Sequence, residues 1–336
     1  MNNYTIWLTT DCNLRCRYCY EGHNKNHIAL SQKMAHQVVR FIWESFSSEN
    51  EELCIDFHGG EPLLNFNILR IFVENLKECF PDKRKNYSIT TNATLLNDER
   101  INYLADNIKN ISVSIDGSKE KHDKYRIFAD GKGSYDIAIA NSLKLLCRLQ
   151  ERLRVRMTFR PDTVAGLADD LKQLHALGFK TIAALPDIFN HDWKKQHFEM
   201  LKQEIEIVKR NIDDKNVYFN LIEPLVVQKK GKCTGGLNEV DIYPDGRLYP
   251  CTMAAGISMF EIGNIFRGID VEKRDEILAH SEGKIDTCAD CDMYSFCECI
   301  RCRIVNKLTM NSYVSPNIVQ CLYNHKMIEV NGYLIR

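Results

Sequence analysis

Six short apolar runs separated by longer helical patterns most restrict how this chain can fold. The runs favour strands, and the stretch after each is long enough for a crossover helix. This alternation predicts an α/β fold with a parallel sheet, and six βα units give a partial (β/α)6, TIM-like barrel. The predicted strands are 4–8, 53–57, 87–91, 111–115, 153–159 and 180–185, and the helices between them are 31–46, 67–79, 98–107, 135–149 and 164–177.

The length of the chain and a change in its character predict a second domain. A chain of 336 residues exceeds the usual size of one compact domain. After a charged helical stretch at 194–209 the sequence becomes turn-rich and dense in cysteine. We therefore expect a partial barrel at 1–225 and a small cysteine-rich domain at 226–336.

Charge and cysteine usage restrict the setting in which the chain works. The net charge is −1 and 44% of the residues are apolar, so we expect neither nucleic acid nor a membrane as a partner. The sequence begins without a signal-peptide pattern, which predicts a cytoplasmic location. Without such a signal, 14 clustered cysteines are more typical of metal or redox sites than of disulfides.

Three cysteines follow the first predicted strand directly, at the end of the strands where barrel enzymes carry their active sites. Cys12, Cys16 and Cys19 have the spacing C-x3-C-x2-C, which lets one loop direct three sulfurs at one face of a cubane. Iron-sulfur clusters usually have four cysteine ligands, so a set of three leaves one iron open to another ligand. The alternative is a zinc site, for which His23 and His27 are the nearest additional ligands.

This motif, with the aromatic Tyr18 before the last cysteine, resembles that of the radical S-adenosylmethionine (SAM) superfamily. A second match ends the second strand, where Gly59, Gly60, Glu61 and Pro62 resemble the GGEP element of that family. The resemblance implies a 4Fe-4S cluster on the three cysteines and SAM bound to its open iron. It also implies that the backbone of the GGEP element, including the Glu carbonyl, receives the amino group of SAM, and glycines permit such close approach. An ordinary βα turn is the alternative.

Later strand ends extend the implied SAM site. By resemblance, Ser114 and Asp116 lie near the ribose or carboxylate of SAM, with Thr91 and Asn92 close by. Arg126 is assigned to the SAM carboxylate, since a guanidinium matches a carboxylate with two hydrogen bonds. A solvated loop arginine is the alternative.

The C-terminal third resembles the SPASM domain, which marks a subgroup named for peptide-modifying members. Cys233, Gly246 and Cys251 match its opening, and 241–250 is predicted to form a hairpin that turns at Pro-Asp-Gly. The resemblance implies that Cys233 and Cys251 begin one auxiliary 4Fe-4S cluster. It implies a second auxiliary cluster on four other cysteines, namely Cys288, Cys291, Cys297 and Cys321. Structural zinc is the alternative for this region.

One departure from the SPASM pattern leaves the first auxiliary cluster open to two interpretations. The pattern expects a cysteine where this chain has Arg301, and Cys299 and Cys302 flank that position. Both thiols could complete a four-cysteine site, or one iron could stay open to substrate. The sequence does not decide between them.

The resemblance implies reductive cleavage of SAM to a 5′-deoxyadenosyl radical, which then modifies a ribosomally synthesised peptide. The expected products are a carbon-carbon or thioether crosslink or an epimerised residue. Expected partners are the precursor peptide, an electron donor such as flavodoxin or ferredoxin, and a separate leader-recognition protein unless the chain binds the leader directly.

Sulfatase-maturing members carry an aspartate base after the cysteine at the Cys251 position, where this chain has Thr252, which argues against that activity. No general base is identified from the sequence. Two alternatives stay open: radical oxidation or rearrangement of a small metabolite, and a non-enzymatic iron-sulfur protein.

Overall fold

A computed structural model describes residues 1–22, 27–47, 52–212, 214, 216–229, 233–281, 285–297 and 302–335. The chain forms two compact units. The first unit contains Met1–Arg15, Glu21–Ser112 and Thr234–Ala279. The second contains Cys16–Tyr20, Val113–Cys233 and His280–Arg336. Both units therefore combine segments distant in sequence, and the predicted boundary near residue 225 stays a prediction.

A parallel sheet forms the centre of the first unit. Its strands β1 (Asn3–Trp7), β2 (Glu52–His58) and β3 (Arg84–Thr91) pair in parallel, with Trp7 opposite His58. On the other edge of β1, β9 (Glu239–Ile242) also pairs in parallel, and β10 (Leu248–Tyr249) returns antiparallel to it. The predicted hairpin is thus confirmed, but its addition to the main sheet was not expected. β4 (Asn110–Ser114) crosses from the first unit into the second.

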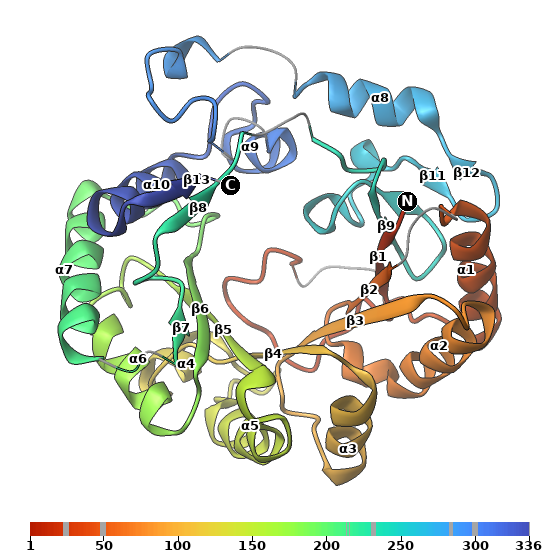
Figure 1. Ribbon diagram of the computed structural model, residues 1–336, viewed down its shortest axis with the longest axis horizontal. Coiled ribbons are helices and arrows are strands. Elements are labelled where there is room, and N and C mark those ends of the chain that lie inside the picture. Colours follow the sequence, from red (N-terminus) through yellow and green to blue (C-terminus); the bar gives the residue numbers. More distant parts are fainter. Residues whose placement is uncertain are drawn as a thin grey trace. The chain divides into compact units, whose positions relative to one another are not determined.

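Amphipathic helices follow the first three strands of the first unit. They are α1 (Gln32–Ser45), α2 (Phe66–Cys79) and α3 (Asp98–Asn107), and α1 and α2 lie along the sheet in Figure 1. Ser31 caps α1 and Asn97 caps α3, because each side chain accepts a hydrogen bond from a first-turn N–H group. The later part of this unit contains β11 (Gly263–Asn264), β12 (Gly268–Ile269), α8 (Val271–Ala279) and the short 3-10 helices η1 (Pro62–Asn65), η3 (Thr252–Ala254) and η4 (Ser258–Phe260).

The second unit continues the βα pattern. Strands β5 (Leu153–Phe159), β6 (Thr181–Pro186) and β7 (Tyr218–Phe219) are parallel, and β8 (Leu225–Val227) pairs in parallel with β13 (Tyr333–Ile335). Its helices are α4 (Lys119–Tyr125), α5 (Tyr135–Leu149), α6 (Leu167–Ala176), α7 (Lys195–Asn211), α9 (Arg303–Met310) and α10 (Ile318–Asn331), with the 3-10 turns η2 (Gln150–Arg152) and η5 (Asp286–Cys288).

The six predicted strands and the helices between them are all present, with ends shifted by a few residues at most. The alternation of strand-like and helix-like patterns therefore predicted the repeated βα units correctly. In the first unit, one face of the sheet is apolar: Tyr4, Ile6, Ile55, Val240 and Ile242 are all at most 1% exposed. The opposite face of the same strands is polar, and it bears on function below.

Candidate functional site

The turn after β2 is packed against the backbone that leads to the first cysteine. A Cβ atom on Gly59 would lie 2.4 Å from the Thr9 carbonyl oxygen, and one on Gly60 would lie 2.3 Å from the Asp11 carbonyl oxygen. The N–H groups of Gly60 and Glu61 donate to those same oxygens over 3.0 and 2.8 Å. Glycine is therefore required here because two backbone segments touch. The sequence argument had assigned these glycines to close approach of a ligand.

The Glu61 side chain connects this turn to the end of β3. Its carboxylate accepts hydrogen bonds from the Thr91 hydroxyl (2.7 Å), the Asn92 N–H (2.8 Å) and the Leu63 N–H (3.1 Å). Burial raises the pKa of the Glu61 carboxyl, and these hydrogen bonds act in the opposite direction. The side chain is 1% exposed, so it holds the turn in place while the Glu61 backbone carbonyl is the predicted SAM contact.

Asn92 connects the predicted SAM residues with the first predicted iron ligand. Its Nδ2 lies 3.8 Å from the Cys12 sulfur and donates to the Asn13 side-chain oxygen over 2.9 Å. Thr94 donates twice to the Asn92 side-chain oxygen, which fixes the orientation of the amide. In the first unit the predicted site residues 59–62, 91 and 92 and Cys12 thus form one contiguous group.

The second unit contains a group centred on Asp116, two residues beyond the predicted SAM residue Ser114 at the end of β4. The Asp116 carboxylate accepts hydrogen bonds from Arg126 Nε (2.9 Å), the Tyr18 hydroxyl and the Thr158 N–H (2.9 Å). The Arg126 guanidinium lies 5.2 Å from the centre of the Tyr18 ring. Asp116 is therefore occupied with orienting Arg126 and the loop of the cysteine motif.

Arg126 also contacts the Cys16 thiol. The pKa of Cys16 is raised to about 11, chiefly by burial, even though the charge and hydrogen bond of Arg126 act to lower it. The Cys19 N–H donates to the Cys16 carbonyl over 3.0 Å, so these two cysteines sit on one turn. The predicted residues Cys16, Cys19, Asp116 and Arg126 thus lie together, and their roles toward a cluster and SAM stay predictions.

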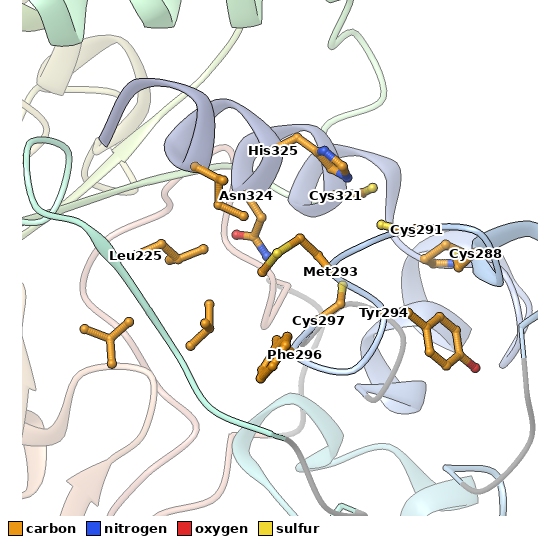
Figure 2. A pocket seen from close by; sticks show the side chains of 14 residues that line it. Leu225, Cys288, Cys291, Met293, Tyr294, Phe296, Cys297, Cys321, Asn324 and His325 are labelled. Carbon is orange, nitrogen blue, oxygen red and sulfur yellow. The ribbon is translucent and has the colours of Figure 1, made fainter. Parts of the chain in front are cut away.

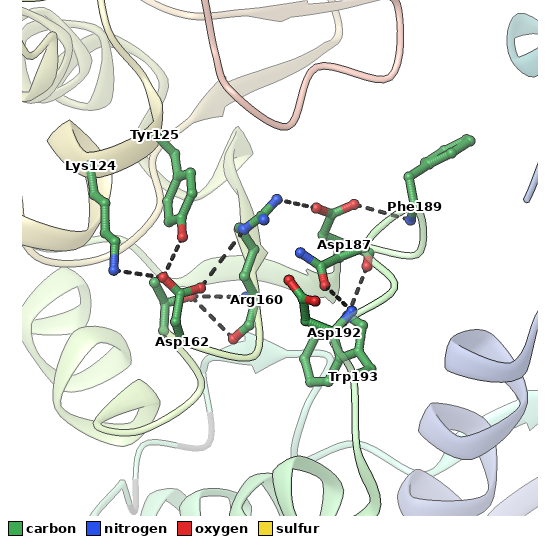
Figure 3. A network of polar contacts seen from close by, with 10 residues as sticks. Lys124, Tyr125, Arg160, Asp162, Asp187, Phe189, Asp192 and Trp193 are labelled. Atoms are coloured by element: carbon green, nitrogen blue, oxygen red, sulfur yellow. Dashed lines mark hydrogen bonds and ion pairs between the residues drawn. The ribbon is translucent and has the colours of Figure 1, made fainter.

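A polar network at the ends of β5 and β6 was missed in the sequence (Figure 3). Arg160 directly follows β5, donates to the buried Asp187 over 2.5 Å and lies 4.6 Å from the centre of the Tyr125 ring. Tyr125 donates its hydroxyl hydrogen to Asp162, which Lys124 also contacts. Burial raises the pKa of Asp187, and Arg160 opposes this. A signal was available in the sequence, because Arg160 and Asp187 lie within two residues of the ends of two predicted strands, at the active-site end.

Four predicted cluster ligands of the second unit meet in one pocket, shown in Figure 2. Cys288, Cys291 and Cys297 come from the turns around η5, and Cys321 comes from α10. The pKa of the Cys321 thiol is raised to about 11, chiefly by burial and in smaller part by the three other thiols. Apolar side chains complete the lining, among them Met293, Phe296 and Ile328.

For the other predicted ligands of the cysteine-rich region, namely Cys233, Cys251, Cys299 and Cys302, the structure shows only part of the expected arrangement. Gly235 packs against Pro250, so the residues just after Cys233 and just before Cys251 lie together. Cys302 is the N-cap residue of α9 and does not line the four-thiol pocket. Cys299 lies outside the described residues.

The donor sets fit the cofactors that the sequence implies. Soft thiolates are the usual ligands of iron-sulfur clusters, and four thiols surround one space in the second unit. Among the described residues, no three His, Cys, Asp or Glu side chains converge as one metal ion requires. In the described parts of the chain, no helix combines the length and apolar character needed to span a bilayer.

Comparison with known proteins identifies relatives of this chain. Residues 8–145 match the model of the radical SAM superfamily. The cysteine-type anaerobic sulfatase-maturating enzyme of Clostridium novyi is 27% identical over 281 residues, which cover 76% of this chain and 74% of that one. The radical SAM cyclopropyl synthase TigE of Paramaledivibacter caminithermalis is 22% identical, over 86% of this chain and 65% of that one.

A solved structure extends the likeness to the whole fold. It is described as native anSMEcpe with bound AdoMet and Kp18Cys peptide, and it superposes with a TM-score of 0.81 at 18% identity, covering 98% of this chain and 96% of that one. The likeness confirms the α/β class with a partial barrel and a cysteine-rich C-terminal region. Residues 8–145 thus form a radical SAM domain, of the kind that uses a 4Fe-4S cluster and SAM, and the chain as a whole is similar to anaerobic sulfatase-maturating enzymes in sequence and fold.

Proposed function

We propose that this enzyme modifies a ribosomally synthesised peptide by radical chemistry, forming a carbon-carbon or thioether crosslink or inverting a stereocentre. The observation that carries the proposal is the four-thiol pocket of Cys288, Cys291, Cys297 and Cys321, outside the SAM-binding part of the chain. The relatives named above add support, since their names include a sulfatase-maturating enzyme and a cyclopropyl synthase. A peptide bound in the structure described as anSMEcpe also favours a peptide substrate.

We assign roles at the first site residue by residue. Cys12, Cys16 and Cys19 hold the cluster that binds SAM, and the backbone of Gly59, Gly60, Glu61 and Pro62 receives the SAM amino group. Thr91, Asn92, Ser114, Asp116 and Arg126 complete the SAM site. When bound, the cluster and SAM supply a 5′-deoxyadenosyl radical that removes hydrogen from unactivated carbon.

The protein groups at this site orient and shield rather than react. The Glu61 carboxylate fixes the turn through its hydrogen bonds to β3, and Asp116 holds Arg126 beside the Cys16 thiol. A preorganised site of this kind needs little rearrangement when a ligand binds. The charge of Arg126 favours the thiolate form of Cys16 that a cluster ligand needs.

Auxiliary clusters and partners complete the proposal. Cys288, Cys291, Cys297 and Cys321 hold one auxiliary cluster, and Cys233 and Cys251 begin another with Cys299, Cys302 or both. A flavodoxin or ferredoxin supplies electrons, and a separate protein recognises the leader unless the chain binds it directly. We also propose a cytoplasmic location, because reduced thiols persist there.

Anaerobic reconstitution tests the proposal. The reduced enzyme is incubated with SAM and with the peptide encoded beside its gene, and also with short synthetic peptides that carry a central cysteine or serine. We expect 5′-deoxyadenosine, a changed peptide mass or, for epimerisation, a D-residue found by chiral amino-acid analysis. Three cubanes require about 12 iron atoms per chain. SAM cleavage with every peptide unchanged in both mass and chirality would instead favour a small-metabolite substrate.

A further inference from the structure

The polar face of the first-unit sheet carries a set of ionisable groups that the proposed function does not yet use. Thr5 pairs with both Asp56 and Asp241, and Trp7 pairs with His58. Since side chains alternate along a strand and paired residues share a face, these side chains lie on the side opposite the apolar one. The face thus collects acidic and aromatic groups at three neighbouring strands, β1, β2 and β9.

Asp241 is the buried centre of this face. It is 3% exposed, and its Oδ2 accepts a hydrogen bond from the Trp7 indole N–H over 2.9 Å. The Trp7 ring lies 4.7 Å from the His58 ring and 5.4 Å from the Tyr243 ring, measured between centroids. His58 directly precedes the turn assigned to SAM, so Trp7 contacts both Asp241 and the residue before that turn.

The Thr252 hydroxyl connects the buried Asp241 carboxylate to a more accessible position. Its hydroxyl hydrogen-bonds the Asp241 carboxylate, and its side chain is partly accessible, whereas Asp241 is not. Thr252 begins the 3-10 helix η3. A buried carboxylate behind a more accessible hydroxyl is an arrangement that can relay a proton.

The surroundings of Asp241 bring its pKa into the range that proton transfer near neutral pH requires. The pKa of the Asp241 carboxyl is raised to about 7, chiefly by burial and in smaller part by the negative charges of Glu239 and Asp56, while the hydrogen bonds from Trp7 and Thr252 act to lower it. A proton acceptor works best when its pKa lies near the working pH.

We infer that Asp241, acting through the Thr252 hydroxyl, accepts the proton that the substrate loses during the reaction. The inference rests on the proposed function and adds to it a substrate class: a residue with an O–H, S–H or N–H group at the reacting centre. Thr252 is the group that contacts substrate, and Asp241 is the positioning residue that orients its hydroxyl.

The step is a proton transfer alone. The substrate X–H proton passes to the Thr252 oxygen as the Thr252 hydroxyl proton passes to Asp241, whose carboxylate becomes a carboxylic acid. The X–H bond breaks and a new O–H bond forms on Asp241. The bonding electron pair remains on X, and no electron moves to the protein.

Four variants of the holoenzyme separate this role from a structural one. The substrate is a peptide that the wild-type enzyme modifies in the assay above. Asp241→Asn and Thr252→Val are each expected to lower product formation from it at least tenfold while 5′-deoxyadenosine still forms. Thr252→Ser, which keeps the hydroxyl, should retain most of the product. Trp7→Phe removes a hydrogen bond that stabilises the carboxylate, so the pH midpoint of product formation should move upward.

Asp245→Asn serves as the matched control, since Asp245 lies in the turn of the same hairpin and pairs with Arg247 near the surface. It should leave product formation within twofold of the wild type. Iron content and melting temperature of every variant show whether it has folded and bound its clusters. If folded Asp241→Asn forms product like the wild type with an unchanged pH profile, the inference is wrong while the proposed function stands.

A second measurement needs no peptide. The infrared difference spectrum between the wild type and Asp241→Asn should contain a protonated carboxyl band that disappears as pH rises through about 7. A wild type that modifies none of the peptides contradicts the proposed function, yet this band still reports whether Asp241 can take up a proton. A band absent at pH 5 or unchanged at pH 9 would overturn the proton-acceptor role.

Discussion

The turn around Glu61 in the first unit and the thiol pocket around Cys321 in the second are both assigned to cofactors, but they are stabilised differently. The Glu61 carboxylate accepts its hydrogen bonds from groups of the protein itself, on Thr91, Asn92 and Leu63. At Cys321, burial and neighbouring thiols raise the pKa, so the anionic form needs a cation. The first site is thus built before its ligand arrives, whereas the second is completed by the metal it binds.

Removing a thiol from the second site should have the largest effect. Cys321→Ala is expected to remove one of three proposed clusters, or about 4 of about 12 iron atoms, and to reduce product formation at least a hundredfold. Iron and acid-labile sulfide analysis gives the cluster count. Cys147→Ala changes an exposed cysteine and should keep the full count. Full iron content in Cys321→Ala would break the contrast between the two sites.

Glu61→Ala tests whether the first site is held by protein groups alone. It leaves three donors without an acceptor in a buried place, so we expect a loss of about 3 kcal/mol in the free energy of unfolding. Denaturant unfolding of protein without iron measures it. Glu61→Gln keeps one acceptor oxygen and should lose about half as much. A loss below about 1 kcal/mol in Glu61→Ala would mean that the turn needs its ligand to stay ordered.

Asp241 should make the stability of the first unit depend on pH. Its folded-state pKa of about 7 lies above its usual value of 3.8, so the stability it contributes is present below about pH 4 and is lost as pH rises through 7. Relative to Asp241→Asn, the wild type should lose about 2 kcal/mol between pH 5 and pH 8. Unfolding at both pH values measures the difference. A pH-independent difference would show an unshifted carboxyl.

Gly60→Ala should have the smallest effect of the four. The new Cβ meets a backbone carbonyl, so one segment must move, at a cost of about 1 to 2 kcal/mol. In Gly131→Ala, the Cβ meets open space, and only the left-handed backbone (φ +85°) disfavours it, by about 1 kcal/mol. Thermal unfolding measures both variants. If Gly131→Ala lost more stability than Gly60→Ala, the result would count against the contact between the two backbone segments at Gly60.

The sequence predicted the strands and helices well because their patterns are local. The buried alternation of 153–159 and the capped stretch 98–107 appear with the predicted bounds. The thiol pocket was also anticipated, since the SPASM resemblance grouped Cys288, Cys291 and Cys297 by their spacing. Assigning Cys321 to them depended on family resemblance, because it lies on a later helix.

Long-range pairing explains what the sequence did not predict. Nothing in the local pattern of 239–242 shows that this strand joins β1, and only that pairing places Asp241 beside Trp7. The Arg160–Asp187 pair likewise depends on β5 and β6 being neighbours. Glycine is required at 59 and 60 because the backbone there touches residues 9 and 11, and the sequence alone does not show that these segments are neighbours.

The pairing of β1 with β9 also sets the order of events during synthesis. Asn3 pairs with Glu239, so the strand that precedes the first cysteine motif lacks its second neighbour until most of the chain has left the ribosome. Contacts this distant in sequence form slowly, because a long loop must close first. We therefore expect the strand that leads to the first cysteine to gain its second neighbour late in synthesis, so that iron delivered to a nearly complete chain would meet a fully paired β1.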